Sequence, residues 1–122
     1  MSSFLYFLNR YWKLCSICLL LVIGFLSLLP LSELPAPGGD KLHHLIAYTA
    51  LVIPVALHKP AYWWLIVLFY FGFSGAIELI QPYVNRYRDW LDMAANGIGL
   101  LSGMLFAELL IKCFPARLKR NE

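Results

Sequence analysis

The sequence predicts an all-α membrane protein: a four-helix transmembrane bundle with both termini in the cytoplasm. Of its 122 residues, 61% are hydrophobic and only 14% are charged, whereas about a quarter of a soluble domain is charged. The apolar residues gather in four long segments, and about 20 apolar residues are enough for a helix to cross a bilayer. This length allows one domain, so residues 1–122 are expected to form a single membrane domain.

Residues 14–31 form the first predicted span. This apolar run would reach about 27 Å as a helix, which is enough to span a bilayer. Residues 4–13 precede it with aromatic and basic side chains, a pattern typical of a segment at the membrane interface. A basic flank also fits a signal peptide. No good small-x-small cleavage site follows, so we expect an uncleaved span.

The second and third predicted spans are residues 41–57 and 61–81. The preceding segment 32–39 contains two prolines and two glycines and is expected to form a loop. Asp40 then suits the N-cap of the second span, and Pro54 is expected to kink that helix, which membrane helices tolerate. The turn between these two spans is only about three residues long. They are therefore expected to be antiparallel neighbours.

The fourth predicted span is residues 92–114, after a polar loop that begins at Pro82. Seven of the ten Lys and Arg residues fall on the side of the two termini, and they predict that this side is cytoplasmic. The basic tail is better explained as a topology signal than as a nucleic-acid-binding surface. The two long polar loops then face the cell exterior or periplasm.

Polar side chains concentrate at the predicted outer ends of the last three spans. They are Asp40, His44 and Tyr48 on the second span, Glu78 and Gln81 on the third, and Asp92 and Asn96 on the fourth. Spacings of three or four residues put each set on one helix face. Because charge inside a bilayer is costly, such residues usually serve a function, and we expect them to form one site.

These motifs, in this order and spacing, resemble the VanZ-like family of small bacterial membrane proteins. The resemblance covers residues 40–103: Asp40-Lys41, His44 and Tyr48, then Glu78xxGln81, Arg86, and Asp92xxxAsn96xxGly99. It departs from the family at Asn85, where a glycine often precedes the loop arginine. The resemblance implies a four-helix inner-membrane protein linked to the cell envelope and, for the founding member, to teicoplanin resistance. It does not supply a reaction.

The candidate catalytic residues are Glu78, Asp92 and His44. Either carboxylate would act as a base and His44 as an acid or base, while Arg86 would stabilise developing charge. The alternative is a structural ion-pair network that holds the helix ends together. Whether the protein is an enzyme is left open.

The expected ligand is a phosphate-bearing lipid headgroup, or a lipid-linked precursor, in the outer leaflet. Helix N-termini and the cations Lys41, Arg86 and Arg88 would attract its phosphate. The candidate binding residues are Arg86, Asn96, Gln81, Asp40, Lys41 and Tyr48. For Asn96 the alternative is a hydrogen bond across a packing seam with Gly99 and Gly103, and for Tyr48 it is a place in the core.

Three further hypotheses concern a metal site, a scaffold function and a transport function. A metal site formed by Asp40, His44, Glu78 and Asp92 has suitable ligand types. The chain has no HExxH or comparable motif, so no metal or other cofactor is predicted. A non-catalytic scaffold for a protein partner is the main alternative function. A small transporter is the third, although the drug/proton exchangers carry a carboxylate in their first helix and this first span is apolar.

Overall fold

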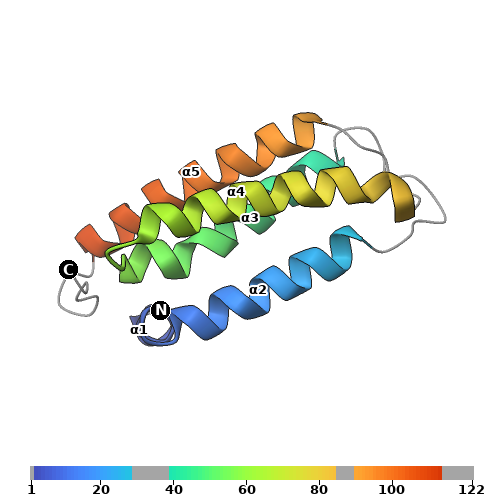
Figure 1. The fold of residues 1–122 in the computed structure, drawn as a ribbon. Coiled ribbons are helices and arrows are strands. Elements are labelled where there is room, and N and C mark those ends of the chain that lie inside the picture. The colour runs from blue at the N-terminus through green and yellow to red at the C-terminus, as the bar shows by residue number, and fades with distance from the viewer. Residues whose placement is uncertain (1, 29–38, 85–89, 114–122) are drawn as a thin grey trace.

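The structure is a computed structural model that describes residues 2–28, 39–84 and 90–113. All the regular secondary structure of the described residues is helical, without a strand, which confirms the all-α prediction (Figure 1). Two of its helices, α4 and α5, are long and apolar enough to cross a membrane, and a third crossing exists if the bent α1–α2 pair is one span. These apolar helices indicate a membrane protein.

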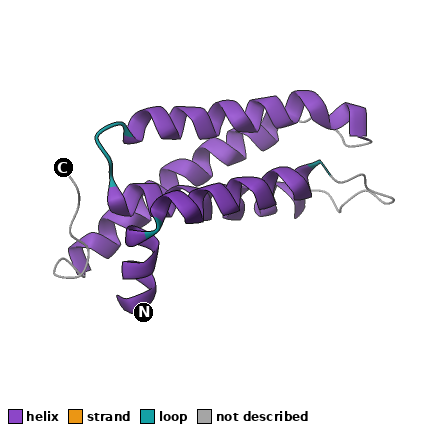
Figure 2. Cartoon of the chain, turned by 60° about the horizontal axis from the view of Figure 1, so that its bottom comes forward, coloured by secondary structure: helices purple, strands orange, loops and turns teal. Residues whose placement is uncertain are grey.

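The N-terminal region forms two helices, one over most of the predicted interfacial segment 4–13 and one over the predicted first span, whose residues 29–31 lie outside the described chain. Helix α1 (Ser2–Arg10) and helix α2 (Trp12–Ser27) meet at an angle of 86°, so α1 turns away from the axis of α2 (Figure 2). The buried Leu5 holds α1 in place by packing with Leu57 and Ala107. The local sequence does not reveal this contact, which places α1 against the ends of α3 and α5.

Helix α3 (Gly39–His58) is the central helix, in contact with all four other α-helices. Its apolar face supplies much of the core through Tyr48, Leu51, Val52 and Val55, each at most 1% exposed. The helix continues through Pro54 to His58. Its described apolar part, Leu42–His58, is shorter than α4 or α5. The structure therefore does not establish the predicted four spans.

Helix α4 (Trp63–Ile80) continues into the 3₁₀ helix η1 (Gln81–Val84), and α5 (Trp90–Cys113) completes the described chain. The start of α3, the end of α4 and the start of α5 lie at the same end of the bundle (Figure 1). This arrangement brings the predicted polar segments of all three helices to one end. The ends of α3 and α5 lie at the opposite end, beside α1.

The most extensive helix contact is between α3 and α5, which run parallel to each other. A Cβ atom added at Gly99 would lie 2.7 Å from the carbonyl oxygen of Leu45, and one added at Gly103 would lie 2.5 Å from that of Thr49. Only glycine allows the two backbones to come so close. The Thr49 hydroxyl, which lies 2.7 Å from Leu45 O, also approaches Gly99 O at 3.1 Å.

Large apolar side chains cover the outside of the bundle. They include Leu21 and Phe25 on α2, Leu68 and Phe69 on α4, and Leu101 and Leu105 on α5, each more than half exposed. A soluble monomer rarely exposes apolar surface on this scale. The surface fits one that contacts lipid.

Candidate functional site

Three ionisable side chains from three helices meet inside the polar end of the bundle. His44 on α3, Glu78 on α4 and Asp92 on α5 are 7%, 0% and 2% exposed. One nitrogen or oxygen atom from each lies within 4.8 Å of the others. These are the three residues that the sequence nominates as catalytic. They lie close together in the structure, although His44 and Asp92 are 48 positions apart in the sequence.

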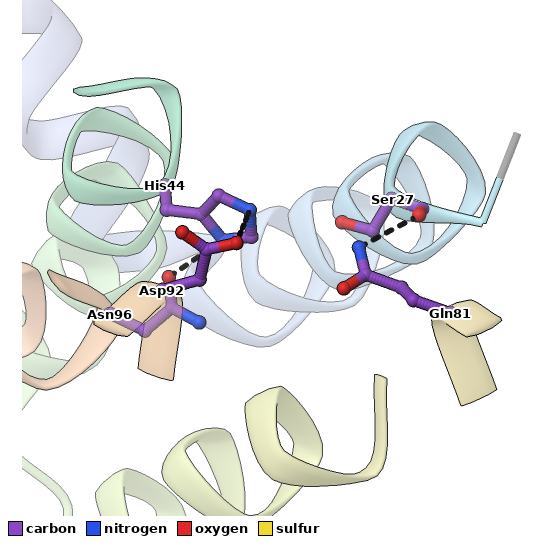
Figure 3. A network of polar contacts seen from close by, with 5 residues as sticks. All are labelled: Ser27, His44, Gln81, Asp92 and Asn96. Atoms are coloured by element: carbon purple, nitrogen blue, oxygen red, sulfur yellow. Dashed lines mark hydrogen bonds and ion pairs between the residues drawn. The ribbon is translucent and has the colours of Figure 1, made fainter. Parts of the chain in front are cut away.

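Asn96 fixes the orientation of the His44 ring. Asn96 Oδ1 lies 2.9 Å from His44 Nδ1, and because an amide oxygen can only accept, Nδ1 carries the proton in this bond. The other ring nitrogen, Nε2, then faces Asp92 Oδ2 at 3.8 Å (Figure 3). That distance is longer than a charged hydrogen bond, for which about 2.7–2.9 Å is usual.

Gln81 connects the site to α2. Its Nε2 donates a hydrogen bond of 3.1 Å to the carbonyl oxygen of Ser27, near the end of α2. Its side-chain oxygen is buried and accepts no hydrogen bond from the described residues. Figure 3 shows this oxygen on the side of the side chain that faces Asp92. Gln81 therefore links η1 with α2, and its acceptor oxygen lies on the side of the polar cluster.

An open cavity of about 240 Å³ lies between α2 and α3, next to this cluster. It is lined by Ile23, Leu26 and Ser27 of α2 and by His43, His44, Ala47 and Tyr48 of α3. His44 belongs to both the cavity wall and the buried cluster. A molecule in the cavity would therefore lie next to the ionisable groups.

The charge of the cluster sets what it can do chemically. Two carboxylates buried close together repel each other, and a buried charge is stable only when it is paired or binds a metal ion. The positive charge must come from a basic side chain or from a bound cation. Such a buried group of ionisable side chains is suited to proton transfer or ion binding.

The predicted binding residues lie in different places in the structure. Asn96 and Gln81 lie in or beside the cluster, and Tyr48 is a buried core residue that also lines the cavity. Asp40 lies within α3, which begins at Gly39, so the prediction that Asp40 is the N-cap is wrong. The side chains of Asp40 and Lys41 are not among those described. Arg86 and Arg88 lie outside the described residues.

Two further residues, Ser27 and His43, belong to the site and are not among the predicted site residues. Ser27 lies in an apolar run and contributes its carbonyl oxygen to the contact with Gln81, which no side-chain pattern signals. His43 is exposed and lines the cavity. Its position in the sequence, directly before His44, could have indicated that it lies near the site.

No family model matches this chain, and no curated protein or solved structure matches it either.

Proposed function

We propose that this chain is a VanZ-like protein of the bacterial inner membrane, and that it binds a phosphate-bearing envelope lipid or lipid-linked precursor at the outer leaflet. The observation that carries the proposal is the open cavity between α2 and α3, which adjoins the buried cluster of His44, Glu78 and Asp92. Modification of the bound lipid by this cluster would be a further step.

The lining of the cavity suits an amphipathic ligand. Ile23, Leu26 and Ala47 offer apolar surface, while Ser27, His43 and His44 offer polar groups at the same site. Its volume of about 240 Å³ is slightly below the range of roughly 300–1,000 Å³ for pockets that enclose whole small molecules. This size suits a headgroup whose hydrocarbon chains remain outside.

The hydrocarbon chains of the bound lipid would lie along the outer face of α2. Leu26, which lines the cavity, is 55% exposed, and its neighbour Val22 is 52% exposed. The cavity thus borders an apolar helix surface of the kind that contacts lipid tails. A lipid could insert its headgroup laterally, between the helices, while its tails stay in the bilayer.

Recognition of the phosphate would come from positive groups at the same end of the bundle. Helices α3 and α5 both begin there, and helix N-termini attract anions. Lys41, Arg86 and Arg88 are the basic residues that the sequence assigns to this end. With both termini cytoplasmic, as the distribution of Lys and Arg predicts, this end faces the outer leaflet.

A pair of bulky substitutions tests the cavity. Ala47→Phe places a phenyl ring in the cavity, whereas the control Ala76→Phe adds the same ring to an exposed position on α4. Binding of a polyprenyl phosphate and of the matching polyprenol would be measured on the purified protein in detergent. We expect Ala47→Phe to weaken phosphate-lipid binding at least about tenfold, or about 1.4 kcal/mol, and Ala76→Phe to leave it unchanged.

Two results would overturn this proposal. If both lipids bind equally well to the parent protein, phosphate is not recognised. If Ala47→Phe binds the phosphate lipid like the parent, the lipid binds elsewhere.

A non-catalytic scaffold is the second candidate function. It is favoured by the way that the polar groups join helices: His44 to Asn96 links α3 with α5, and Gln81 to Ser27 links η1 with α2. In that case the cluster stabilises the fold, and a protein partner would bind the bundle surface.

A further inference from the structure

We propose that His44, Glu78 and Asp92 bind one divalent transition-metal ion, with zinc as the ion whose preferences best match this ligand set. A histidine nitrogen with two carboxylate oxygens suits zinc and, next, manganese. All three side chains are buried, and they come from α3, α4 and α5. An ion here would therefore connect three helices at one point.

The separations between the ligand atoms are close to those required. Zinc binds histidine nitrogen and carboxylate oxygen at about 2.0–2.2 Å, so two ligands on one tetrahedral ion lie about 3.3–3.5 Å apart. His44 Nε2 and Asp92 Oδ2 are 3.8 Å apart, and no pair in the group of three exceeds 4.8 Å. Small side-chain rotations that draw the atoms together would complete the site.

The hydrogen bond from Asn96 orients His44 as a ligand. Histidines that bind metal commonly donate their other N–H to a carbonyl or carboxylate, which fixes the tautomer. Here Asn96 Oδ1 accepts from Nδ1, so Nε2 is the ring nitrogen that faces the Asp92 carboxylate. A cation between Nε2 and this carboxylate would bind both groups.

Gln81 supplies a second, independent observation. Its side-chain oxygen is buried, accepts no hydrogen bond within the described chain, and is turned toward Asp92 (Figure 3). Three protein ligands leave a fourth position open for water, as in catalytic zinc sites. A water molecule bound to the ion would donate the hydrogen bond that Gln81 Oε1 can accept.

A second histidine provides a matched comparison at the other end of the bundle. His58 Nδ1 lies 3.1 Å from Asn9 Oδ1, so this pair has the same chemistry as His44 and Asn96. The His58 ring instead stacks on Trp12, with 5.1 Å between the ring centroids. It therefore serves packing, and His58→Gln is a control that leaves the proposed metal site intact.

Metal binding would be measured on the full-length protein in detergent. The protein would be stripped with a chelator and titrated with Zn²⁺, Mn²⁺ and Mg²⁺ by calorimetry. Co²⁺ would be added separately, because its visible spectrum reports nitrogen and oxygen ligands. We expect one Zn²⁺ per chain, a higher melting temperature with Zn²⁺ than after stripping, and a Co²⁺ spectrum of a low-coordinate site.

Variants would then assign the ligands. His44→Gln, Glu78→Gln and Asp92→Asn should each weaken Zn²⁺ binding by more than about 100-fold, while Asn96→Ala, which removes only the orienting bond, should weaken it by about 10–100-fold. His58→Gln and Glu108→Gln should bind like the parent, since Glu108 is a partly exposed residue next to Lys59. Helix content would be checked by circular dichroism.

The parent protein alone can overturn the proposal, so the test does not depend on the variants folding. If the stripped parent takes up no Zn²⁺ or Mn²⁺ and its melting temperature does not respond to them, there is no site. If Zn²⁺ binds equally to the parent and to His44→Gln, the ion binds elsewhere. Neither result depends on lipid binding, so failure of this inference is distinguishable from failure of the proposed function.

Discussion

His44 on α3 and Asn96 on α5 lie 2.9 Å apart, at the polar end of the closest helix pair in the bundle. Asn96, Gly99 and Gly103 share one face of α5, so the residues that allow close packing and the residue that orients His44 belong to one surface. The packing of α3 against α5 therefore determines the geometry of the site. A change in the spacing of these two helices should disturb both their packing and the orientation of His44.

The first prediction tests the close packing of α3 and α5. Gly99→Ala should destabilise the protein by about 1–3 kcal/mol, the usual cost of overpacking, because the new Cβ would lie 2.7 Å from Leu45 O. The control is Gly72→Ala, where a Cβ meets nothing within 4 Å. Melting temperature in detergent is the measurement. Equal melting temperatures for the two variants would contradict the close packing.

The second prediction separates a functional cluster from a structural one. Glu78→Gln and Asp92→Asn keep side-chain size and remove charge. In a functional site, modification of the bound lipid should be lost, while expression and the melting temperature of the chelator-stripped protein remain near those of the stripped parent. In a structural network, loss of one charged partner costs about 3–5 kcal/mol. A parallel fall in activity, expression and the melting temperature of the stripped protein would therefore favour the scaffold hypothesis.

The third prediction concerns topology. Tyr83 in η1 and Tyr62 before α4 are both exposed and lie at opposite ends of that helix. In a variant without Cys15, Cys18 and Cys113, Tyr83→Cys should react with a membrane-impermeant maleimide added to spheroplasts. Tyr62→Cys should react only after lysis. The reverse pattern would move the polar end of the bundle to the cytoplasm and exclude a ligand in the outer leaflet.

The fourth prediction distinguishes the two loop arginines. Arg86→Lys should weaken binding of a phosphate-bearing lipid by about 1–3 kcal/mol, because lysine cannot reproduce the planar two-point contact of a guanidinium with phosphate. Arg88→Lys should have little effect. Lipid binding at low and high salt would measure both. If Arg86→Lys binds the lipid like the parent, Arg86 is not a phosphate ligand.

Much of the fold followed from local composition. The apolar runs predicted helices, and α3, α4 and α5 begin and end within a few residues of the predicted bounds. The first span was predicted to begin at residue 14, and α2 begins at Trp12. Local composition does not show the angle of 86° between α1 and α2, where Leu5 packs with residues more than 50 positions away.

The sequence by itself determined the helical class, the apolar exterior and the identity of the polar residues that share each helix face. These properties depend on spacings of three or four residues, which local helix geometry converts directly into position. Only the tertiary structure decided that α3 and α5 form the closest pair, that Asn96 orients His44, and that Ser27 and Gln81 meet beside an open cavity. Those contacts join residues about 50 positions apart, and their distances arise from how whole helices pack, which no local pattern encodes.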